Sequence, residues 1–385
     1  MKSVTILGAT GSVGTSTLDL VEREPDRFRV VALTANCDVA RLAAAAIRTR
    51  AEFAVVADEQ CLPELRTALA GTGVRAGGGA DAIAEAAASG ADWTMGAIVG
   101  CAGLKPVLAA IEQGGTVVIA NKEPLVSAGD VILRAAARSG ATLLPADSEH
   151  NAIFQCFDAA RPEGIRRIIL TCSGGPFRDW TTDQMRGVTL EQAVKHPNWS
   201  MGAKISVDSA TMMNKGLELI EAARLFPIAP DRIEIVIHAQ SVIHSLVDYV
   251  DGSVLAQLGP PDMRTPIAHT LAWPDRMATP MAPLDLVGIG QLDFAAPDPV
   301  RFPALRLARE ALDAGGARPA ILNAANEVAV DAFLNRRIRF LEIAAIVEDT
   351  LIRYDPAAPD SVDAVLVIDA DARRLASERV KDCVV

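Results

Sequence analysis

The sequence predicts an α/β protein with an N-terminal doubly wound sheet, a central α/β domain and a C-terminal bundle of helices. Three observations lead to this prediction. A strand, a glycine-rich turn and a helix follow one another over residues 4–21, strand–helix units repeat to about residue 147, and apolar residues recur at helical spacing beyond residue 300. The 385 residues, half of them hydrophobic, suffice for two or three domains with a large core.

The first strand–helix unit has the pattern of a dinucleotide-binding turn. The strand at residues 4–7 is followed by Gly8-Ala9-Thr10-Gly11-Ser12-Val13-Gly14 and by a helix that continues through Val21. Gly8 and Gly11 let the backbone approach a pyrophosphate, and the N–H groups at the helix N-terminus favour an anion. The spacing is GxxGxxG rather than GxGxxG, so the prediction of a Rossmann-like domain also needs the strands that follow.

The second strand, at residues 29–34, arrives at the expected distance and ends in Thr34-Ala35-Asn36-Cys37-Asp38. An acidic residue at this tip is typical of NAD-binding domains, whereas a nearby arginine accommodates the 2′-phosphate of NADP. No acid stands at the tip itself, which favours NADP. No arginine stands there either, and Asp38 is close, so the preference is modest.

Polar residues follow two later strands of the same predicted sheet. Asn121-Lys122-Glu123 comes after the strand at 116–120, and Asp147-Ser148-Glu149-His150 comes after the strand at 141–144. Ligands of open α/β sheets collect at these carboxyl ends. If the chain stays extended, Asp147 and Glu149 share one face and suit Mg²⁺ or Mn²⁺. Helix capping for the first group and a solvated turn for the second are the simpler alternatives.

The central region offers a second group of candidates. A predicted helix at 151–160 and a strand at 165–171 lead into Ser173-Gly174-Gly175, which is either a phosphate cradle or a tight turn. The polar loop 196–202 contains Trp199, which is either part of a lid or a buried anchor.

A predicted helix at 207–221 places Asn214, Lys215 and Glu218 on one face. Such a group is either a weak surface ion pair or, together with Ser209, a set of phosphate ligands. Glu218 would then complete a three-carboxylate metal site with Asp147 and Glu149.

The rest of the sequence predicts secondary structure and adds no candidate site residues. Strands are expected at 233–237 and 254–258, and the proline-rich stretch 259–283 predicts a stiff crossing and a domain boundary. Helices are expected near 303–314, 319–335, 340–354 and 370–382. In the second of these, Asn323, Asn326 and Glu327 stand out as polar, with packing or capping as their expected role.

Composition excludes several classes of function. The net charge of −11 and the pI of about 5.0 argue against binding to nucleic acid or to anionic membranes. No apolar run approaches the roughly 18 residues of a membrane span, and the first residues enter a strand directly, without the pattern of a signal peptide. Six scattered cysteines without a CxxC pair fit a reduced cytoplasm better than a disulfide framework or a zinc site.

Taken together, the motifs resemble one family. They are Gly-Ala-Thr-Gly-Ser-Val-Gly at 8–14, Asn-Lys-Glu at 121–123, Asp-Ser-Glu-His-Asn-Ala-Ile-Phe-Gln at 147–155, Ser-Gly-Gly-Pro-Phe at 173–177, His-Pro-Asn-Trp-Ser-Met-Gly at 196–202, Asp-Ser-Ala-Thr-Met-Met-Asn-Lys-Gly-Leu-Glu at 208–218, Pro-Asp-Met-Arg-Thr-Pro at 261–266 and Asn-Ala-Ala-Asn-Glu at 323–327. The chain resembles the 1-deoxy-D-xylulose 5-phosphate reductoisomerases of the methylerythritol phosphate route to isoprenoids, nearly from end to end.

The resemblance implies a cytoplasmic homodimer that uses NADPH and Mg²⁺ or Mn²⁺. It implies an NADPH domain at 1–147, a catalytic and dimerisation domain at 148–272 with a flap near 196–205, a linker at 273–298 and a helical bundle at 299–385. The resemblance also implies residue roles. The metal would be bound by Asp147, Glu149 and Glu218, and the substrate phosphate by Ser173, Ser209, Asn214 and Lys215. The substrate would be contacted by Lys122, Ser148, Glu149, His196 and Glu218, of which Lys122, Glu149 and His196 would be catalytic; the cofactor would be contacted by Thr10, Gly11, Ser12, Val13, Asn36, Asp38, Asn121, Glu123 and Gly202, and Trp199 would lie on the flap.

Three positions depart from the family pattern. Pro124 follows Asn-Lys-Glu where serine is usual, Ala239 replaces the proline of a His-Pro-Gln-Ser motif, and Cys37 stands where a basic residue often meets the 2′-phosphate. Two alternative functions remain. A non-rearranging NADP-dependent dehydrogenase of a phosphorylated small molecule would not need the three carboxylates, and a non-catalytic nucleotide-binding or regulatory protein would be expected to lose a metal ligand.

Overall fold

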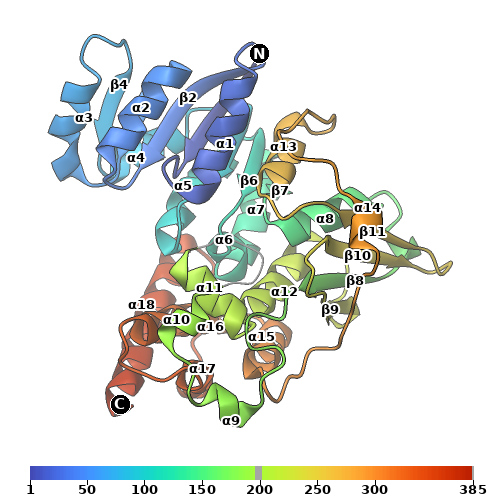
Figure 1. Ribbon diagram of the computed structural model, residues 1–385. Helices are drawn as coiled ribbons and strands as arrows, with labels where there is room; N and C mark the ends of the chain where they lie inside the picture. The colour runs from blue at the N-terminus through green and yellow to red at the C-terminus, as the bar shows by residue number, and fades with distance from the viewer. Residues whose placement is uncertain (196–201, 384–385) are drawn as a thin grey trace. The chain divides into compact units, whose positions relative to one another are not determined.

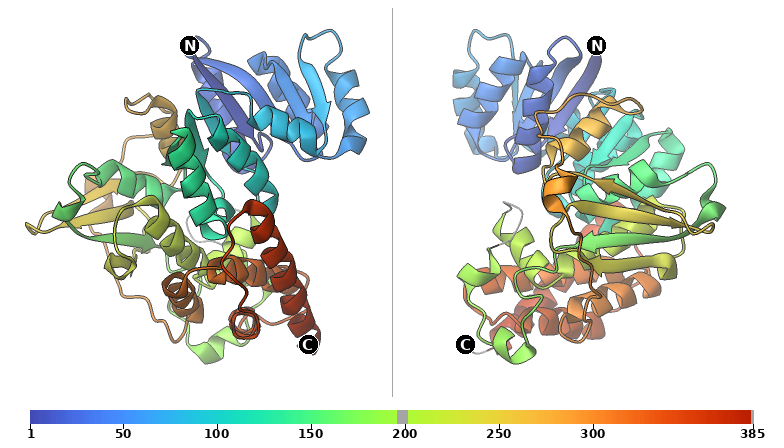
Figure 2. Two further views of the ribbon diagram at one scale, coloured as in Figure 1. Left: turned by 180° about the vertical axis from the view of Figure 1, so that it is seen from behind. Right: turned by 45° about the vertical axis from the view of Figure 1, so that its right-hand side comes forward.

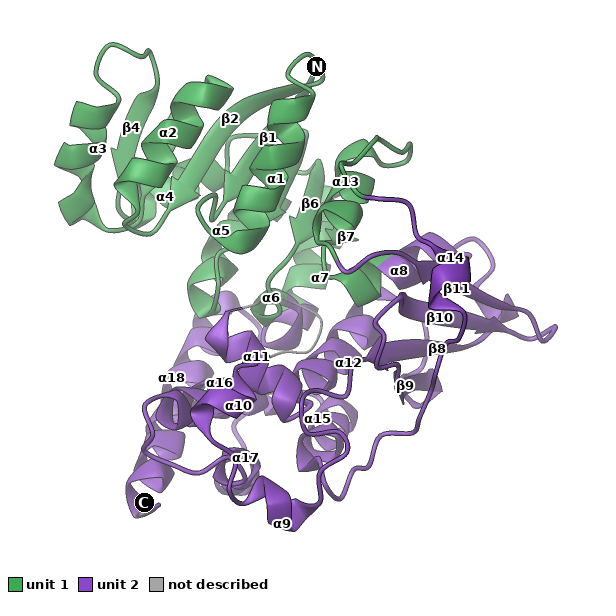
Figure 3. Ribbon diagram, viewed as in Figure 1, with its two compact units in different colours: residues 1–124, 131–151, 262–281 green, residues 125–130, 152–261, 282–385 purple. Residues whose placement is uncertain are grey.

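The protein is described from a computed structural model, whose placed residues are 1–195 and 202–383. The chain forms two compact units, each made from separate stretches of sequence (Figure 3). Unit 1 comprises residues 1–124, 131–151 and 262–281, and unit 2 comprises 125–130, 152–261 and 282–385. The chain passes between the units five times, and three of these passages lie within helices: α6 (Glu123–Val126), α7 (Gly129–Ser139) and α8 (Ser148–Cys156).

Unit 1 is a doubly wound α/β unit (Figure 1). Its further elements are β1 (Lys2–Leu7), α1 (Ser12–Arg23), β2 (Phe28–Ala35), α2 (Val39–Thr49), β3 (Phe53–Val56), η1 (Glu59–Cys61), α3 (Leu62–Ala68), β4 (Arg75–Gly78), α4 (Ala80–Ala87), β5 (Trp93–Gly96), η2 (Cys101–Gly103), α5 (Leu104–Glu112), β6 (Thr116–Ile119), β7 (Thr142–Pro145) and α13 (Arg264–Ala272).

The sheet of unit 1 has seven strands in the order β4-β3-β2-β1-β5-β6-β7, and every pair is parallel. Helices α1, α2 and α3 adjoin one another in one layer, and α4 adjoins α5 in another. The strand order reverses between β1 and β5, which is the point where such sheets bind ligands. The predicted Rossmann-like architecture of the N-terminal region is confirmed.

The edge strand β4 was not predicted, because Arg-Ala-Gly-Gly has no apolar alternation. Packing explains the glycine at position 77 of this strand. A Cβ on Gly77 would lie 2.7 Å from the ring of Phe53, and Arg75 covers the same ring with its guanidinium carbon 3.5 Å from the centroid. A small residue is therefore needed at this position beside Phe53.

The proline-rich stretch corrects a prediction. It contains a helix, α13, rather than only a stiff crossing, and α13 belongs to unit 1, where it adjoins α1 and β7. Pro266 lies in the first turn of α13, where a missing N–H costs no helical hydrogen bond. Lys2 Nζ donates to the Leu271 carbonyl (2.8 Å) and Trp93 Nε1 donates to the Thr270 carbonyl (3.1 Å), so α13 is held to the first residues of β1 and β5.

Unit 2 combines a small sheet with helices. Its elements are η3 (Pro162–Gly164), β8 (Ile165–Cys172), α9 (Thr182–Met185), α10 (Leu190–Ala193), α11 (Ala203–Ala210), α12 (Met213–Leu225), η4 (Pro230–Arg232), β9 (Ile233–Ile237), β10 (Ile243–Tyr249), β11 (Val254–Leu258), α14 (Leu286–Ile289), α15 (Pro303–Ala314), α16 (Arg318–Leu334), α17 (Glu342–Arg353) and α18 (Val362–Asp382).

The four-stranded sheet has the order β11-β10-β8-β9, with β10 antiparallel to both of its neighbours. Helix α12 adjoins β8, β9 and α15, and α16 adjoins α17 and α18. Both views of Figure 2 show the C-terminal helices, drawn in brown and red, gathered together. One apolar cluster joins the inner residues of these helices to the sheet, for example through Phe177, whose ring centroid lies 5.1 Å from that of Phe340.

Three element predictions in unit 2 are corrected. Strand β10 was missed, and α18 begins at Val362, where the Ser361 hydroxyl accepts from the Ala364 N–H (3.2 Å), rather than near residue 370. The helix predicted at 207–221 is two helices, because Met212, the N-cap of the second one, has a positive φ of 62° that a continuous helix does not allow. None of the six cysteines forms a disulfide, and within the placed residues no helix is long and apolar enough to cross a membrane.

Candidate functional site

The glycine-rich turn between β1 and α1 has the close backbone approaches that the sequence predicts. Gly8 has a φ of 89°, and a Cβ at this position would lie 2.5 Å from the Ala97 carbonyl oxygen after β5. A Cβ on Gly14 would lie 2.2 Å from the Gly8 carbonyl oxygen. No side chain caps the N-terminus of α1, and its first turn contains no acid. This helix end therefore suits an anionic group beside Thr10, Gly11, Ser12 and Val13.

At the tip of β2, Asn36 and Cys37 are exposed. Asp38 is the N-cap of α2, and its Oδ1 accepts from the Arg41 N–H at 3.1 Å. The Arg41 guanidinium also lies near this acid, with Nη1 3.6 Å from Asp38 Oδ2, and its Nη2 donates to the Thr15 hydroxyl at 3.1 Å. The sequence prediction did not include Arg41, although its position three residues after a capping Asp is a visible signal.

The Asn121-Lys122-Glu123 group lies just beyond β6 at the carboxyl edge of the sheet in unit 1. Asn121 Nδ2 donates to Glu123 Oε2 at 3.3 Å, and both residues are buried. Lys122 Nζ lies 2.9 Å from Asp147 Oδ2, beyond the neighbouring strand β7, and both side chains are largely buried. The structure thus brings together two motifs that are 25 residues apart in sequence.

The conformation of 147–150 differs from the prediction. Asp147 and Glu149 do not continue an extended strand, because α8 begins at Ser148 and not at Asn151. Asp147 Oδ1 accepts from the N–H groups of Glu149 (3.1 Å) and His150 (3.4 Å), so it caps the first turn. The Ser148 hydroxyl donates to Glu149 Oε2 at 2.5 Å. The two carboxylates are therefore held by helix capping and by a neighbouring hydroxyl, at the end of β7.

In unit 2, Ser173 follows β8 and its hydroxyl accepts from the Gly175 N–H at 3.2 Å. Gly174 and Gly175 have φ values of 76° and 68°, which glycine adopts without strain. A Cβ on Gly175 would lie 2.6 Å from the Ser209 carbonyl oxygen in α11. The glycine pair therefore allows the Ser173 loop to pass directly against the helix that contains Ser209.

The three residues predicted to share a helical face do so in α12. The Nδ2 of Asn214 and the Nζ of Lys215 both donate to the Glu218 carboxylate. The side chains of Lys215 and Glu218 are 3% and 1% exposed, which excludes the weak surface pair as an interpretation. A lysine ammonium and an asparagine amide are N–H donors of the kind that bind an oxyanion such as a phosphate.

A buried polar network supports α11 from the helices behind it. Asp208, which precedes Ser209, accepts from Asn326 Nδ2 of α16 (2.8 Å) and lies 2.9 Å from Lys204 Nζ. Asp208 and Asn326 are both almost fully buried. Burial raises the pKa of the Glu327 carboxyl, but the charges of Lys204 and Arg373 outweigh it and hold that pKa below its usual value. The packing role expected for Asn326 is thus confirmed, with a charged partner that the sequence did not indicate.

The remaining predicted residues lie around residue 200. His196 and Trp199 are outside the described residues, and Gly202, which is exposed, is the N-cap of α11. The candidate residues thus form two sets within their own units: Asn121, Lys122, Glu123, Asp147, Ser148 and Glu149 in unit 1, and Ser173, Gly202, Ser209, Asn214, Lys215 and Glu218 in unit 2.

Known families match the chain along most of its length. A model described as 1-deoxy-D-xylulose 5-phosphate reductoisomerase matches residues 4–129, the model of that enzyme's C-terminal domain matches 143–226, and a model described as DXP reductoisomerase C-terminal domain matches 258–375.

Curated relatives agree with these matches. The 1-deoxy-D-xylulose 5-phosphate reductoisomerase of Zymomonas mobilis is 62% identical over 372 residues, covering 97% of this chain and 96% of that protein. The enzyme of the same name from Caulobacter vibrioides is 56% identical over 385 residues, covering 98% of this chain and 96% of that protein.

Solved structures agree as well. The Zymomonas mobilis enzyme in complex with NADPH has a TM-score of 0.95 and 59% identity, covering 98% of this chain and 99% of the other. A reductoisomerase in complex with NADPH, fosmidomycin and magnesium has a TM-score of 0.94 and 44% identity, covering 99% of this chain and 98% of the other.

Proposed function

The chain belongs to the 1-deoxy-D-xylulose 5-phosphate reductoisomerase family, and from this premise we propose that it converts 1-deoxy-D-xylulose 5-phosphate into 2-C-methyl-D-erythritol 4-phosphate. The reaction rearranges the carbon skeleton and then reduces the resulting aldehyde, in the synthesis of isoprenoid precursors. One observation within this chain supports the proposal most strongly. The Lys215–Glu218 pair is buried in the same helix as Asn214, and a generic dehydrogenase has no need of it.

The cofactor is NADPH, and the unit 1 turn fits it. Gly8 and Gly14 occupy positions where any Cβ would collide with backbone, which is the close-packed turn that a pyrophosphate requires. Thr10, Gly11, Ser12 and Val13 would hold the pyrophosphate at the end of α1. Asn36, Asn121, Glu123 and Gly202 would contact the rest of the molecule, and Asp38 would lie beside its adenosine ribose.

Asp147, Glu149 and Glu218 would hold Mg²⁺ or Mn²⁺. Hard divalent cations prefer carboxylate oxygens, and a reductoisomerase structure with magnesium supports this choice of metal. When bound, the metal supplies Lewis acidity to a substrate oxygen that gains negative charge, and NADPH supplies a hydride. Lys122 would neutralise part of the acidic site, since its ammonium already lies 2.9 Å from Asp147.

The substrate phosphate would lie in unit 2. Ser173 and Ser209 offer hydroxyls on two segments that Gly175 brings into contact, and Asn214 and Lys215 offer N–H donors one turn further along the chain. Because the phosphate is remote from the reacting carbons, the binding energy of these phosphate contacts serves to position the sugar for reaction. Lys122, Ser148, Glu149 and His196 would contact the sugar itself, with Lys122, Glu149 and His196 acting in catalysis.

We also infer the organisation expected from the sequence. The division at 147, 272 and 298 and the flap near 196–205 remain proposals, with Trp199 as a probe of closure. A homodimer is supported by the edge strand β11, where Val254 and Leu255 are 48% and 50% exposed on a strand that has no second neighbour within the described chain. We also propose a cytoplasmic location, as expected from six scattered cysteines without a CxxC pair.

The test is the oxidation of NADPH, followed by its absorbance, with 1-deoxy-D-xylulose 5-phosphate and Mn²⁺, with and without a chelator. Metal-dependent oxidation with the branched product identified by mass spectrometry is the expected result. Oxidation without rearranged product would instead support the non-rearranging dehydrogenase. No oxidation by a folded protein that binds NADPH would overturn the proposal and direct attention to Pro124 and Ala239.

A further inference from the structure

The adenosine ribose of NADPH has a 2′-phosphate that a Rossmann-like domain has to meet with positive charge at the tip of its second strand. Here the tip consists of exposed Asn36 and Cys37, followed by the acid Asp38. Neither of the first two is a cation, and an acid in this region is the usual partner of the ribose hydroxyls of NAD. The cofactor assignment therefore requires a cation from elsewhere in unit 1.

Asp38 is already engaged by its own helix. Its Oδ1 accepts from the Arg41 backbone N–H at 3.1 Å, and its Oδ2 lies 3.6 Å from Arg41 Nη1. The carboxylate therefore caps α2, and its negative charge is offset by the guanidinium one turn away. A carboxylate held in this way is less able to accept hydrogen bonds from a ribose.

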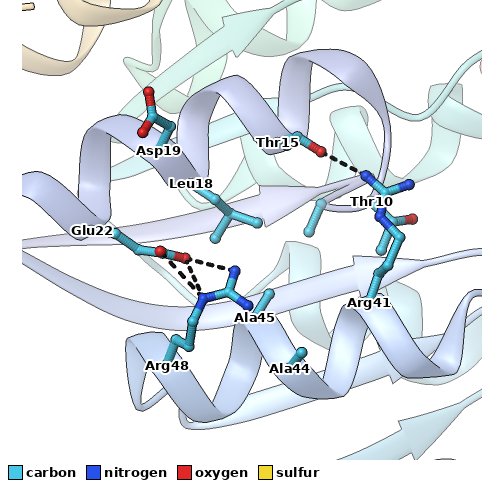
Figure 4. Close-up of a pocket in the computed structure, with 10 residues that line it drawn as sticks. Thr10, Thr15, Leu18, Asp19, Glu22, Arg41, Ala44, Ala45 and Arg48 are labelled. Atoms are coloured by element: carbon cyan, nitrogen blue, oxygen red, sulfur yellow. Dashed lines mark hydrogen bonds and ion pairs between the residues drawn. The ribbon is translucent and has the colours of Figure 1, made fainter. Parts of the chain in front are cut away.

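Arg41 lies between the glycine-rich turn and the tip of β2. Its Nη2 donates to the Thr15 hydroxyl of α1 at 3.1 Å, yet its side chain is 58% exposed. It lines a cavity of about 260 Å³ between α1 and α2 that also includes Thr10, a residue of the proposed pyrophosphate turn (Figure 4). A guanidinium has five N–H donors in a planar fork, so these two contacts leave donors for a phosphate.

The second arginine of this cavity is arranged differently. Arg48 donates from Nε and Nη2 to the Glu22 carboxylate at 3.0 to 3.3 Å, and these two residues lie away from Thr10 and Arg41 in Figure 4. Its charge is therefore already matched by a carboxylate in bidentate geometry. Arg48 provides a matched control, because it is an arginine of the same helix and the same cavity.

We propose that Arg41 is the residue that selects NADPH over NADH, by receiving the 2′-phosphate in place of a basic residue at position 37, and that Asp38 caps α2 and pairs with Arg41 in the free protein rather than binding ribose. This inference rests on the proposed use of NADPH. A dianionic phosphate attracts the guanidinium more strongly than one carboxylate does, so Arg41 would turn from Asp38 to the cofactor while Thr15 keeps it in place.

The test measures dissociation constants of NADPH and NADH by nucleotide fluorescence, without substrate or metal, for the full chain and its Arg41→Met, Arg41→Lys and Arg48→Met variants. Arg41→Met should weaken NADPH about 10- to 100-fold, the range for one charged contact, and leave NADH unchanged. Arg41→Lys should retain most of the preference, and Arg48→Met should change neither constant. Equal losses for both nucleotides, or a larger effect in Arg48→Met, would overturn the proposal.

Two further measurements separate the possible outcomes. Adenosine 2′,5′-bisphosphate should displace NADPH from the wild-type chain but not from the Arg41→Met variant. In contrast, 5′-AMP should compete for the site equally well in both proteins. Asp38→Asn keeps the helix cap but removes the charge, so NADPH should bind a few-fold more tightly; weaker NADH binding would show that Asp38 holds ribose and refute its assigned role. A wild-type chain that binds neither nucleotide would contradict the proposed function itself.

Discussion

Replacing Asn326 by aspartate should set two carboxylates against each other in the interior of unit 2. The side chains are isosteric, so the new oxygen would stand where Asn326 Nδ2 now donates to Asp208 Oδ1 at 2.8 Å. Both residues are almost fully buried, and water cannot separate the two charges. The folded variant can relieve this repulsion by binding one proton, which the two acids then share.

The magnitude follows from the cost of that proton. Protonating an aspartate of ordinary pKa at pH 7 costs about 4 kcal/mol. The ammonium of Lys204, 2.9 Å from Asp208, weakens the repulsion between the two carboxylates and so lowers the total cost. We therefore expect the free energy of unfolding to fall by about 3 kcal/mol at pH 7. In this range the folded variant binds one proton more than the unfolded chain, so its stability decreases as pH rises. A loss of about 3 kcal/mol corresponds to about two pH units at about 1.4 kcal/mol per unit, so the difference from wild type should shrink as pH falls below about 6 and vanish near pH 4.

The assay is urea unfolding followed by far-ultraviolet circular dichroism at several pH values. Asn335→Asp is a matched control, because Asn335 Nδ2 also donates to a carboxylate, Asp331 (3.0 Å), at the exposed end of the same helix. Solvent screening should limit its cost to about 0.5 kcal/mol or less. Asn326→Leu adds no charge and should have a smaller effect that does not depend on pH. A pH-independent loss in Asn326→Asp, or an equal loss in Asn335→Asp, would refute the reasoning.

Three further predictions concern the two units separately. Gly175→Ala, whose Cβ would lie 2.6 Å from the Ser209 carbonyl, should raise the substrate KM at least about 10-fold without changing NADPH affinity, whereas Gly252→Ala, with a φ of 90° but open space, should leave KM unchanged. Lys215→Ala should raise KM about 10- to 100-fold in steady-state assays, and an unchanged KM would remove it from the phosphate site. Burial, aided by Arg276, lowers the pKa of His269 to about 4, so stability should fall by roughly 1 kcal/mol as pH drops from 6.5 to 4, and His269→Gln should flatten that profile in urea titrations.

Local patterns were sufficient for the parts of the fold that depend on neighbouring residues. The turn at Gly8–Gly14 was predictable because glycine spacing, strand and helix all agreed, and the face shared by Lys215 and Glu218 follows from helical geometry alone. The start of α8 was mispredicted, although Asp-Ser-Glu before an apolar run is a common beginning of a helix. Asp147 and Glu149 were interpreted only as metal ligands, but Asp147 also caps the first turn of α8.

Features that depend on distant residues could not be predicted from patterns. The polar character of Asn326 is visible in the sequence, but its partner Asp208 lies 118 residues away and only the folded chain pairs them. In strand β4, Gly77 leaves room for the ring of Phe53, and no alternation of apolar residues reveals this fit. The helix α13 was obscured by Pro266 and by the prolines around it, since the effect of a proline depends on whether it falls in the first turn or further inside a helix.

The position of α13 has a consequence for synthesis of the protein. The ribosome completes the seven strands of unit 1 by residue 145, but the helix that accepts the hydrogen bonds of Lys2 and Trp93 is not made until residue 272. During the intervening elongation, the nascent N-terminal sheet exposes the surface that α13 later covers on α1 and β7. A fragment that stops after residue 151 should therefore aggregate or recruit chaperones, and adding a peptide of residues 262–281 should rescue it.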